Sequence, residues 1–155
     1  MASPYRCTVT IDGTKFGAVT TSVQFSTEKD RTGTPQMGSL GTLIRVWADF
    51  HDDQNLPFST IKKLFELANI VTLEKIKPMK IEYWKDDSRQ DALCTYSFNG
   101  WIRRFETTNP IDLGMDEDAT STQFKSITPE LNHLLILDLK PAMNQKNYKE
   151  IKMSN

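Results

Sequence analysis

Apolar and polar residues alternate over several stretches of this chain, which is the pattern of strands with one buried face. In the first stretch Cys7, Val9 and Ile11 alternate with arginine and threonine residues, and Asp12-Gly13 follows as a hairpin turn. The alternation predicts six strands: Tyr5–Ile11, Ala18–Thr27, Thr42–Phe50, Met79–Trp84, Ala92–Thr107 and Leu131–Leu139. Gly100, inside the fifth of them, is expected to mark a bend or a bulge.

One segment has the period of a helix instead. Ile61, Leu64, Phe65 and Ala68 recur at i, i+3, i+4 and i+7, and Ser59 is placed to cap the N-terminus. One helix is too little for alternating βαβ units. The sequence therefore predicts a mainly β fold: a small antiparallel barrel of about six strands, closed or partly closed, with one lateral α-helix and a long extended loop.

The predicted long loop spans residues 28–41, EKDRTGTPQMGSLG, which contain three glycines and a proline but no apolar period. Loops longer than about 12–15 residues are usually functional or disordered, so we expect a binding surface here, with a floppy connector as the alternative. Residues 109–122 form a second irregular region, and the tail after Pro141 is expected to be weakly ordered. A single domain, 1–155, with an ordered core of about 5–140 is the simplest organisation.

Charge and hydropathy exclude several classes of partner. Nineteen basic and 20 acidic residues give a net charge of -1, which provides no broad attraction for nucleic acids or anionic membranes. The N-terminus, MASPYRCTVTIDG, lacks the basic start and apolar run of a signal peptide, and no apolar stretch approaches the length of a membrane span. We therefore expect no nucleic-acid partner, no membrane insertion, and folding in the cytoplasm.

Motifs for chemistry are missing. The two histidines, His51 and His133, have no metal-ligand spacing with the cysteines, and the chain contains no HExxH, paired CxxC, Walker, GxSxG or SxxK motif. Cys7 and Cys94 fit buried reduced thiols, and a disulfide between them is possible but unnecessary. The sequence predicts no catalytic, cofactor-binding or metal-binding residue.

Three clusters of polar side chains imitate binding sites, and each has a simpler explanation. A strand end in solvent explains the acidic group near residue 50, and the group near residue 115 lacks the order of a calcium loop. These groups are Asp49, His51, Asp52 and Asp53, and Asp112, Asp116, Glu117 and Asp118. Arg103 and Arg104, beside Trp101 and Phe105, resemble a platform for single-stranded nucleic acid, but adjacent strand residues point to opposite faces, which favours packing.

Three segments in this order carry a family resemblance: DRTGTPQMGSLGTLIRVWADF (Asp30–Phe50), the helix STIKKLFELA (Ser59–Ala68), and KPMKIEYWKDD followed by ALCTYSFNGWIRRFETTNPID (Lys77–Asp112). The chain resembles the haemolysin-coregulated protein (Hcp) family, the tube proteins of bacterial type VI secretion systems, which are similar to phage tail tube proteins. The resemblance covers about residues 5–140.

The resemblance implies a non-catalytic subunit of a secretion tube. Six copies would close into a ring, and rings would stack into a hollow tube that carries effectors and that a contractile sheath propels from the cell, with spike and baseplate proteins as further partners. Ring stacking would fall to the long loop: Asp30, Arg31, Thr32, Gly33, Thr34, Pro35, Gln36, Met37 and Gly38. Candidates for contacts between protomers are Trp47, Trp84, Trp101, Arg103 and Arg104, each tryptophan being equally expected in its own core. The polar face of Thr20, Ser22, Gln24 and Ser26 is a candidate lining of the lumen.

Two other functions compete with this interpretation. The first is the tail tube of a phage or of an extracellular contractile injection particle, which shares the fold and the ring geometry. The second is a monomeric β-barrel that binds a small ligand or another protein. An enzyme ranks last, because no set of acid, base and nucleophile can be named.

Overall fold

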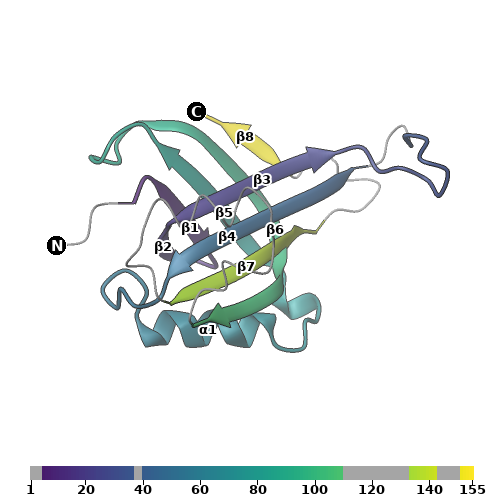
Figure 1. The fold of residues 1–155 in the computed structure, drawn as a ribbon. Coiled ribbons are helices and arrows are strands. Elements are labelled where there is room, and N and C mark those ends of the chain that lie inside the picture. The colour runs from purple at the N-terminus through teal and green to yellow at the C-terminus, as the bar shows by residue number, and fades with distance from the viewer. Residues whose placement is uncertain (1–4, 37–39, 110–132, 143–150) are drawn as a thin grey trace.

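The computed structural model describes residues 5–36, 40–109, 133–142 and 151–155 (Figure 1). These residues form eight strands, one α-helix and one 3-10 helix. The strands are β1 (Cys7–Ile11), β2 (Thr14–Ala18), β3 (Thr20–Ser26), β4 (Gly41–Asp49), β5 (Lys77–Trp84), β6 (Ala92–Thr108), β7 (Leu134–Pro141) and β8 (Lys152–Ser154); the helices are α1 (Phe58–Ala68) and η1 (Leu73–Lys75). Among the described residues, no helix has the length and apolar character to cross a membrane.

The strands form one antiparallel sheet in the order β2-β1-β5-β6-β7-β4-β3, with β8 paired to β6. A mainly β, antiparallel fold with one α-helix is confirmed, but the sheet has eight strands rather than six and is not closed, since β2 and β3 are its two ends. Only Val19 separates these two strands along the chain, and its N–H donates to the Trp47 carbonyl at 2.8 Å. The ends are therefore joined by the chain itself rather than by a ladder, and the sheet curls around its core (Figure 1).

β6 is the long strand that connects the two halves of the sheet. Its first half pairs with β5 up to Gly100, and its second half pairs with β7 from Gly100 onwards. A Cβ at Gly100 would lie 2.4 Å from the Lys140 carbonyl oxygen, so only glycine permits this close approach of backbones. This approach explains the glycine at position 100, and the bulge lies further along the strand, between Ile102 and Arg104.

The core lies inside the curl of the sheet. Ile44, Val46 and Ala48 of β4 are buried, and the residues between them face outward, as the alternation predicts. Leu64 and Leu67 of α1 join this core from one open side. The predicted cap by Ser59 is wrong, because α1 begins at Phe58 after Pro57 and has no side-chain cap.

Two further differences from the prediction concern the N-terminal strands and the C-terminal residues. The predicted strand over 18–27 begins earlier and divides into β2 and β3, which follow the Asp12-Gly13 turn, where both residues have the positive φ of a tight hairpin. No strand was expected after Pro141, yet β8 pairs with β6 there. Cys7 and Cys94 are both free thiols, as expected.

Candidate assembly surfaces

The connection between β3 and β4 is an arm that extends from one side of the sheet (Figure 1). The Gln36 N–H donates to the Glu28 carbonyl at 2.8 Å, and Lys29 and Pro35 form a β-bridge. All residues from Gln24 to Gln36 are exposed. The described part of the arm is therefore an ordered hairpin extension, held by its own hydrogen bonds.

Asp30 organises the tip of the arm. Its carboxylate accepts hydrogen bonds from the Thr32 hydroxyl at 2.7 Å and from the Thr32 and Thr34 N–H groups, each at 2.9 Å. These bonds, that of the Thr32 hydroxyl first, lower the pKa of Asp30 below its usual value. Gly33 has a φ of +85°, which glycine adopts without strain. The charged form of Asp30 thus sets the shape of the tip at neutral pH.

Of the nine predicted ring-stacking residues, Asp30–Gln36 lie together on this tip. Met37 and Gly38 lie outside the described residues. The candidate lumen face is also placed: Ser22, Gln24 and Ser26 are exposed along β3, which is paired on one side only in the described sheet. The roles of the tip in stacking and of this face in the lumen stay predictions.

A row of charges crosses the outer faces of β4, β7 and β6. Arg45 lies opposite Asp138, which in turn lies opposite Arg104. Arg45 donates to both Asp138 oxygens, from Nε at 2.6 Å and from Nη2 at 3.1 Å, and the hydrogen bonding raises the pKa of Arg45. Arg104 Nη1 is 4.0 Å from Asp138, and Arg104 also pairs with Glu106. Arg104, a predicted contact for the next protomer, is therefore engaged within its own subunit.

The other predicted contact residues differ in accessibility. Trp84 is buried and donates from Nε1 to the Thr8 hydroxyl at 2.8 Å, so little of its surface is available to another protomer. Trp47 and Trp101 are half-buried. Arg103 has no pairing partner on β7 because it is the extra residue of the bulge, and both it and Arg104 are exposed. Because of the bulge, the two arginines do not follow the simple alternation of adjacent strand residues that was expected.

The acidic group near residue 50 stabilises a turn. Asp49 accepts a hydrogen bond from the His51 N–H at 2.9 Å, and Asp52 accepts one from the Tyr5 hydroxyl at 3.1 Å, whose pKa is raised mainly by burial. Throughout the described ranges, no three His, Cys, Asp or Glu side chains are grouped to hold a metal ion. The second acidic group, Asp112–Asp118, lies outside the described residues.

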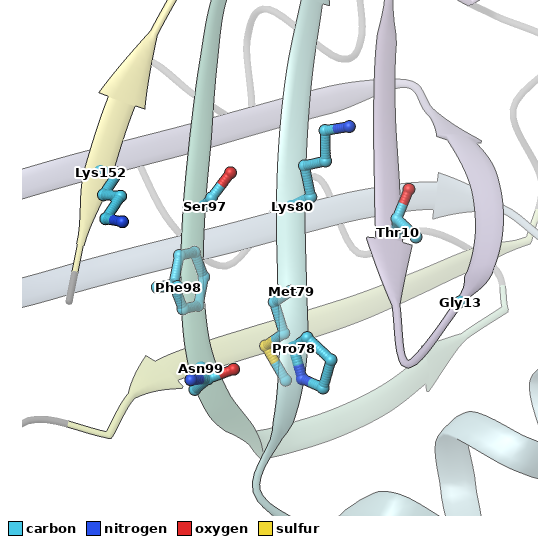
Figure 2. A pocket seen from close by; sticks show the side chains of 9 residues that line it. All are labelled: Thr10, Gly13, Pro78, Met79, Lys80, Ser97, Phe98, Asn99 and Lys152. Atoms are coloured by element: carbon cyan, nitrogen blue, oxygen red, sulfur yellow. The ribbon is translucent and has the colours of Figure 1, made fainter.

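An open groove follows the outer face of β5 and β6, between β1 and β8 (Figure 2). A pocket of about 360 Å³ has Lys152 of β8 on one side, and Lys80 and Thr10 on the other. A second pocket of about 550 Å³ includes Ser154 and Asn155 at the end of β8. β8 thus borders empty space at both of its ends.

Sequence reasoning missed two features of the surface. The Asn55 side chain donates to the Gly17 carbonyl at 2.9 Å and accepts from the Gly17 N–H at 2.7 Å, so it satisfies the backbone of this one residue on β2, an end strand of the sheet. Ile70, Val71 and Leu73 are exposed directly after α1. The apolar run in ANIVTL was a usable signal for the second feature, whereas the first depends on a long-range contact.

Comparison with known proteins places this geometry. No protein-family model and no curated protein matches the sequence. Hcp1 from Flavobacterium johnsoniae matches in structure, with a TM-score of 0.57 and 12% identity over 97% of this chain and 95% of that chain. The chain has the Hcp fold.

Two further solved structures share this Hcp fold over almost the whole chain. The sheath/tube terminator of an extracellular contractile injection system, PVC, has a TM-score of 0.55 and 18% identity over 97% of this chain and 94% of that one. The tube terminating cap of the anti-feeding prophage has a TM-score of 0.52 and 14% identity over 99% and 91%. The resemblance found in the sequence is confirmed for the fold.

Proposed function

We propose that this chain is a structural subunit of the inner tube of a type VI secretion system, in which six copies form a ring and rings stack into a hollow tube that carries effectors. The observation that carries the proposal is the likeness to Hcp1 and to tube terminators over at least 97% of the chain. A non-catalytic role, with sheath, spike and baseplate proteins as partners, is part of it. So is synthesis in the cytoplasm followed by export through the contractile apparatus.

The unequal edges of the sheet support a ring. A ring needs a head-to-tail contact between two different surfaces, because a contact of one patch with itself stops at a dimer. β2 and β3 are the two end strands of the described sheet: on β2 the Asn55 side chain bonds the outward backbone groups of Gly17, whereas β3 continues into the exposed arm. The exposed apolar residues Ile70 and Leu73 add a surface that contact with a neighbour would bury.

The arm supports stacking. Its tip is exposed, hydrogen-bonded internally and extends beyond the sheet, so it can reach another ring without unfolding the body (Figure 1). Its polar composition also suits a contact that must form and separate in water. The outer face of β3 carries hydroxyl and amide groups, which suit a lumen that does not retain its cargo. The facing residues of β4 are mixed, because the exposed Leu43 and the half-buried Trp47 flank Arg45 there.

Native mass by light scattering, with negative-stain electron microscopy of the same fraction, tests the proposal. We expect a ring of six times 17.8 kDa with a central hole, and stacks at high concentration. Asp30→Ala, which removes the acceptor at the tip, should reduce stacking and leave the ring intact. Asp86→Ala is the matched control, because Asp86 caps an exposed turn with Ser88 outside the arm. A monomer at every concentration would overturn the proposal.

A terminator or cap of a contractile tube is the second candidate, and the two solved structures of that kind favour it. A cap would contact the end of the tube through one face of its ring, so its rings would have no reason to stack on one another. Rings that never stack, in the wild-type protein and in the Asp30→Ala variant alike, would identify this function. This result would identify a cap, but it would fit a cap of an extracellular contractile particle as well as a cap of a type VI secretion system.

A further inference from the structure

β8 continues the line of β7 along the same edge of β6. The β7 ladder places Pro141 opposite Gly100, and the Ala142 N–H then donates to the Asn99 carbonyl at 2.7 Å. β8 pairs in the same antiparallel direction with the next stretch of β6, residues 95–97. β7 and β8 are therefore two pieces of one ladder.

The chain is longer at this break than the ladder requires. A continuous ladder with Pro141 opposite Gly100 would bring residue 144 opposite Ser97, whereas Lys152 occupies that place, eight residues further along. Eight residues span about 26 Å when extended. This reach is comparable with the separation of two touching domains of this length, each with a radius of gyration of about 15 Å. The connection therefore allows β8 to reach an adjacent copy where the two sites lie within about 26 Å.

Few contacts hold β8 on its own subunit. The strand has three residues, all exposed. Met153, which lies opposite Tyr96, is 68% exposed. Figure 2 shows Lys152 on one side of the pocket and the side chains on β5 and β1 on the other, with those of β6 between them. Directly before the strand, the half-buried Ile151 packs against the core, so this side chain is the main packing that β8 takes with it and that the neighbouring copy has to supply again.

We propose that β8 is exchanged in the assembly, so that β8 of one copy pairs with residues 95–97 of β6 in the next copy. This rests on the proposed function, because copies must be neighbours for the exchange to occur. The occupant is a second copy of the same strand, so every hydrogen bond of the ladder is reproduced and no new complementarity is needed. A ring also raises the local concentration of the neighbouring strand far above that of a free peptide.

Engineered disulfides distinguish exchange from pairing within one chain. Ser97→Cys and Lys152→Cys place thiols at opposed positions of the β6–β8 ladder. The background is Cys7→Ala and Cys94→Ala, tested first for assembly. When the two single variants are mixed, assembled and oxidised, we expect covalent dimers on a non-reducing gel, and a ladder of larger species from the double variant. Gln24→Cys with Leu43→Cys, opposed on the β3–β4 ladder, is the control that should give only intrachain disulfides.

The possible outcomes separate the exchange from the tube. Rings or stacks that yield only intrachain Ser97–Lys152 disulfides refute the exchange and leave the tube standing. Protein that stays monomeric at every concentration refutes both. Removal of residues 152–155, which keeps the core contact of Ile151, is the second test, since it should weaken assembly at least tenfold with little change in the melting temperature of the monomer. Truncated chains that assemble like the full chain would also refute the exchange.

Discussion

Arg45→Met should destabilise this fold much more than the loss of an ordinary surface ion pair. Arg45 holds Asp138 through two hydrogen bonds of 2.6 and 3.1 Å. The Asp138 side chain is only 10% exposed and that of Arg45 33%. In the variant the carboxylate stays almost buried, and the nearest remaining cation is Arg104, whose Nη1 is 4.0 Å away.

The burial of the pair sets the magnitude. Removing one partner of a buried ion pair costs about 3–5 kcal/mol, whereas an exposed pair contributes about 0–1 kcal/mol. Because a third of Arg45 is exposed, water partly screens this pair, and we expect the free energy of unfolding to fall by about 2 kcal/mol. For a chain of this length that corresponds to a decrease in melting temperature of about 4–8 °C.

Urea unfolding, followed by circular dichroism below the concentration of assembly, measures this effect. Asp138→Asn and the double variant complete a cycle, whose coupling energy we expect to exceed about 1 kcal/mol. Arg6→Met is the control, because the Arg6–Asp87 pair is more than half exposed on both sides, and its loss should cost less than about 0.5 kcal/mol. Equal losses for Arg45→Met and Arg6→Met, or additive effects in the cycle, would refute the reasoning.

Two further predictions concern the core. Gly100→Ala should lower the free energy of unfolding by about 2 kcal/mol or more, because its Cβ would lie 2.4 Å from the Lys140 carbonyl oxygen. Gly13→Ala, which has open space but a φ of +78°, should cost about 1 kcal/mol. Urea unfolding measures both losses, and equal losses would contradict this reasoning. Burial raises the pKa of Cys7 from 9.0 to about 11, so the stability from its neutral thiol is complete below pH 9 and is lost as the pH rises toward 11. Cys7→Ala should therefore lose less stability than the wild type between pH 8 and 10.5, and identical slopes would exclude this cause.

Alternation predicted the strands well where each has one buried face. The prediction Ala92–Thr107 differs from β6 by one residue, and Ile44, Val46 and Ala48 are buried as their spacing requires. The break at Val19 was not predictable from local pattern. It exists because β2 pairs with β1 whereas β3 pairs with β4, and both partners are set by the curl of the whole sheet.

The assembly surfaces were predicted to very different degrees. Glycine, proline and the absence of an apolar period located the arm, because such a segment has no core face to bury. The tryptophans gave no such signal, since Trp84 is internal only through its hydrogen bond and packing across β1. β8 was missed because its three exposed residues show no alternation. The eight extra residues between the β7 and β8 ladders are visible only when the register of both ladders on β6 is known.

Two changes of pairing partner produce the curl of a fold that the compared structures share at identities of 12–18%. The first lies between β2, which pairs with β1, and β3, which pairs with β4, and the second lies within β6, so the curl follows from where the partners change rather than from particular side chains. Apolar residues of about the right size satisfy such a core, which leaves most positions free to vary. The outer faces, the arm and β8 are not constrained by the curl. The contacts that decide between a stacking tube and a terminating ring must therefore be measured on the surfaces of this chain itself.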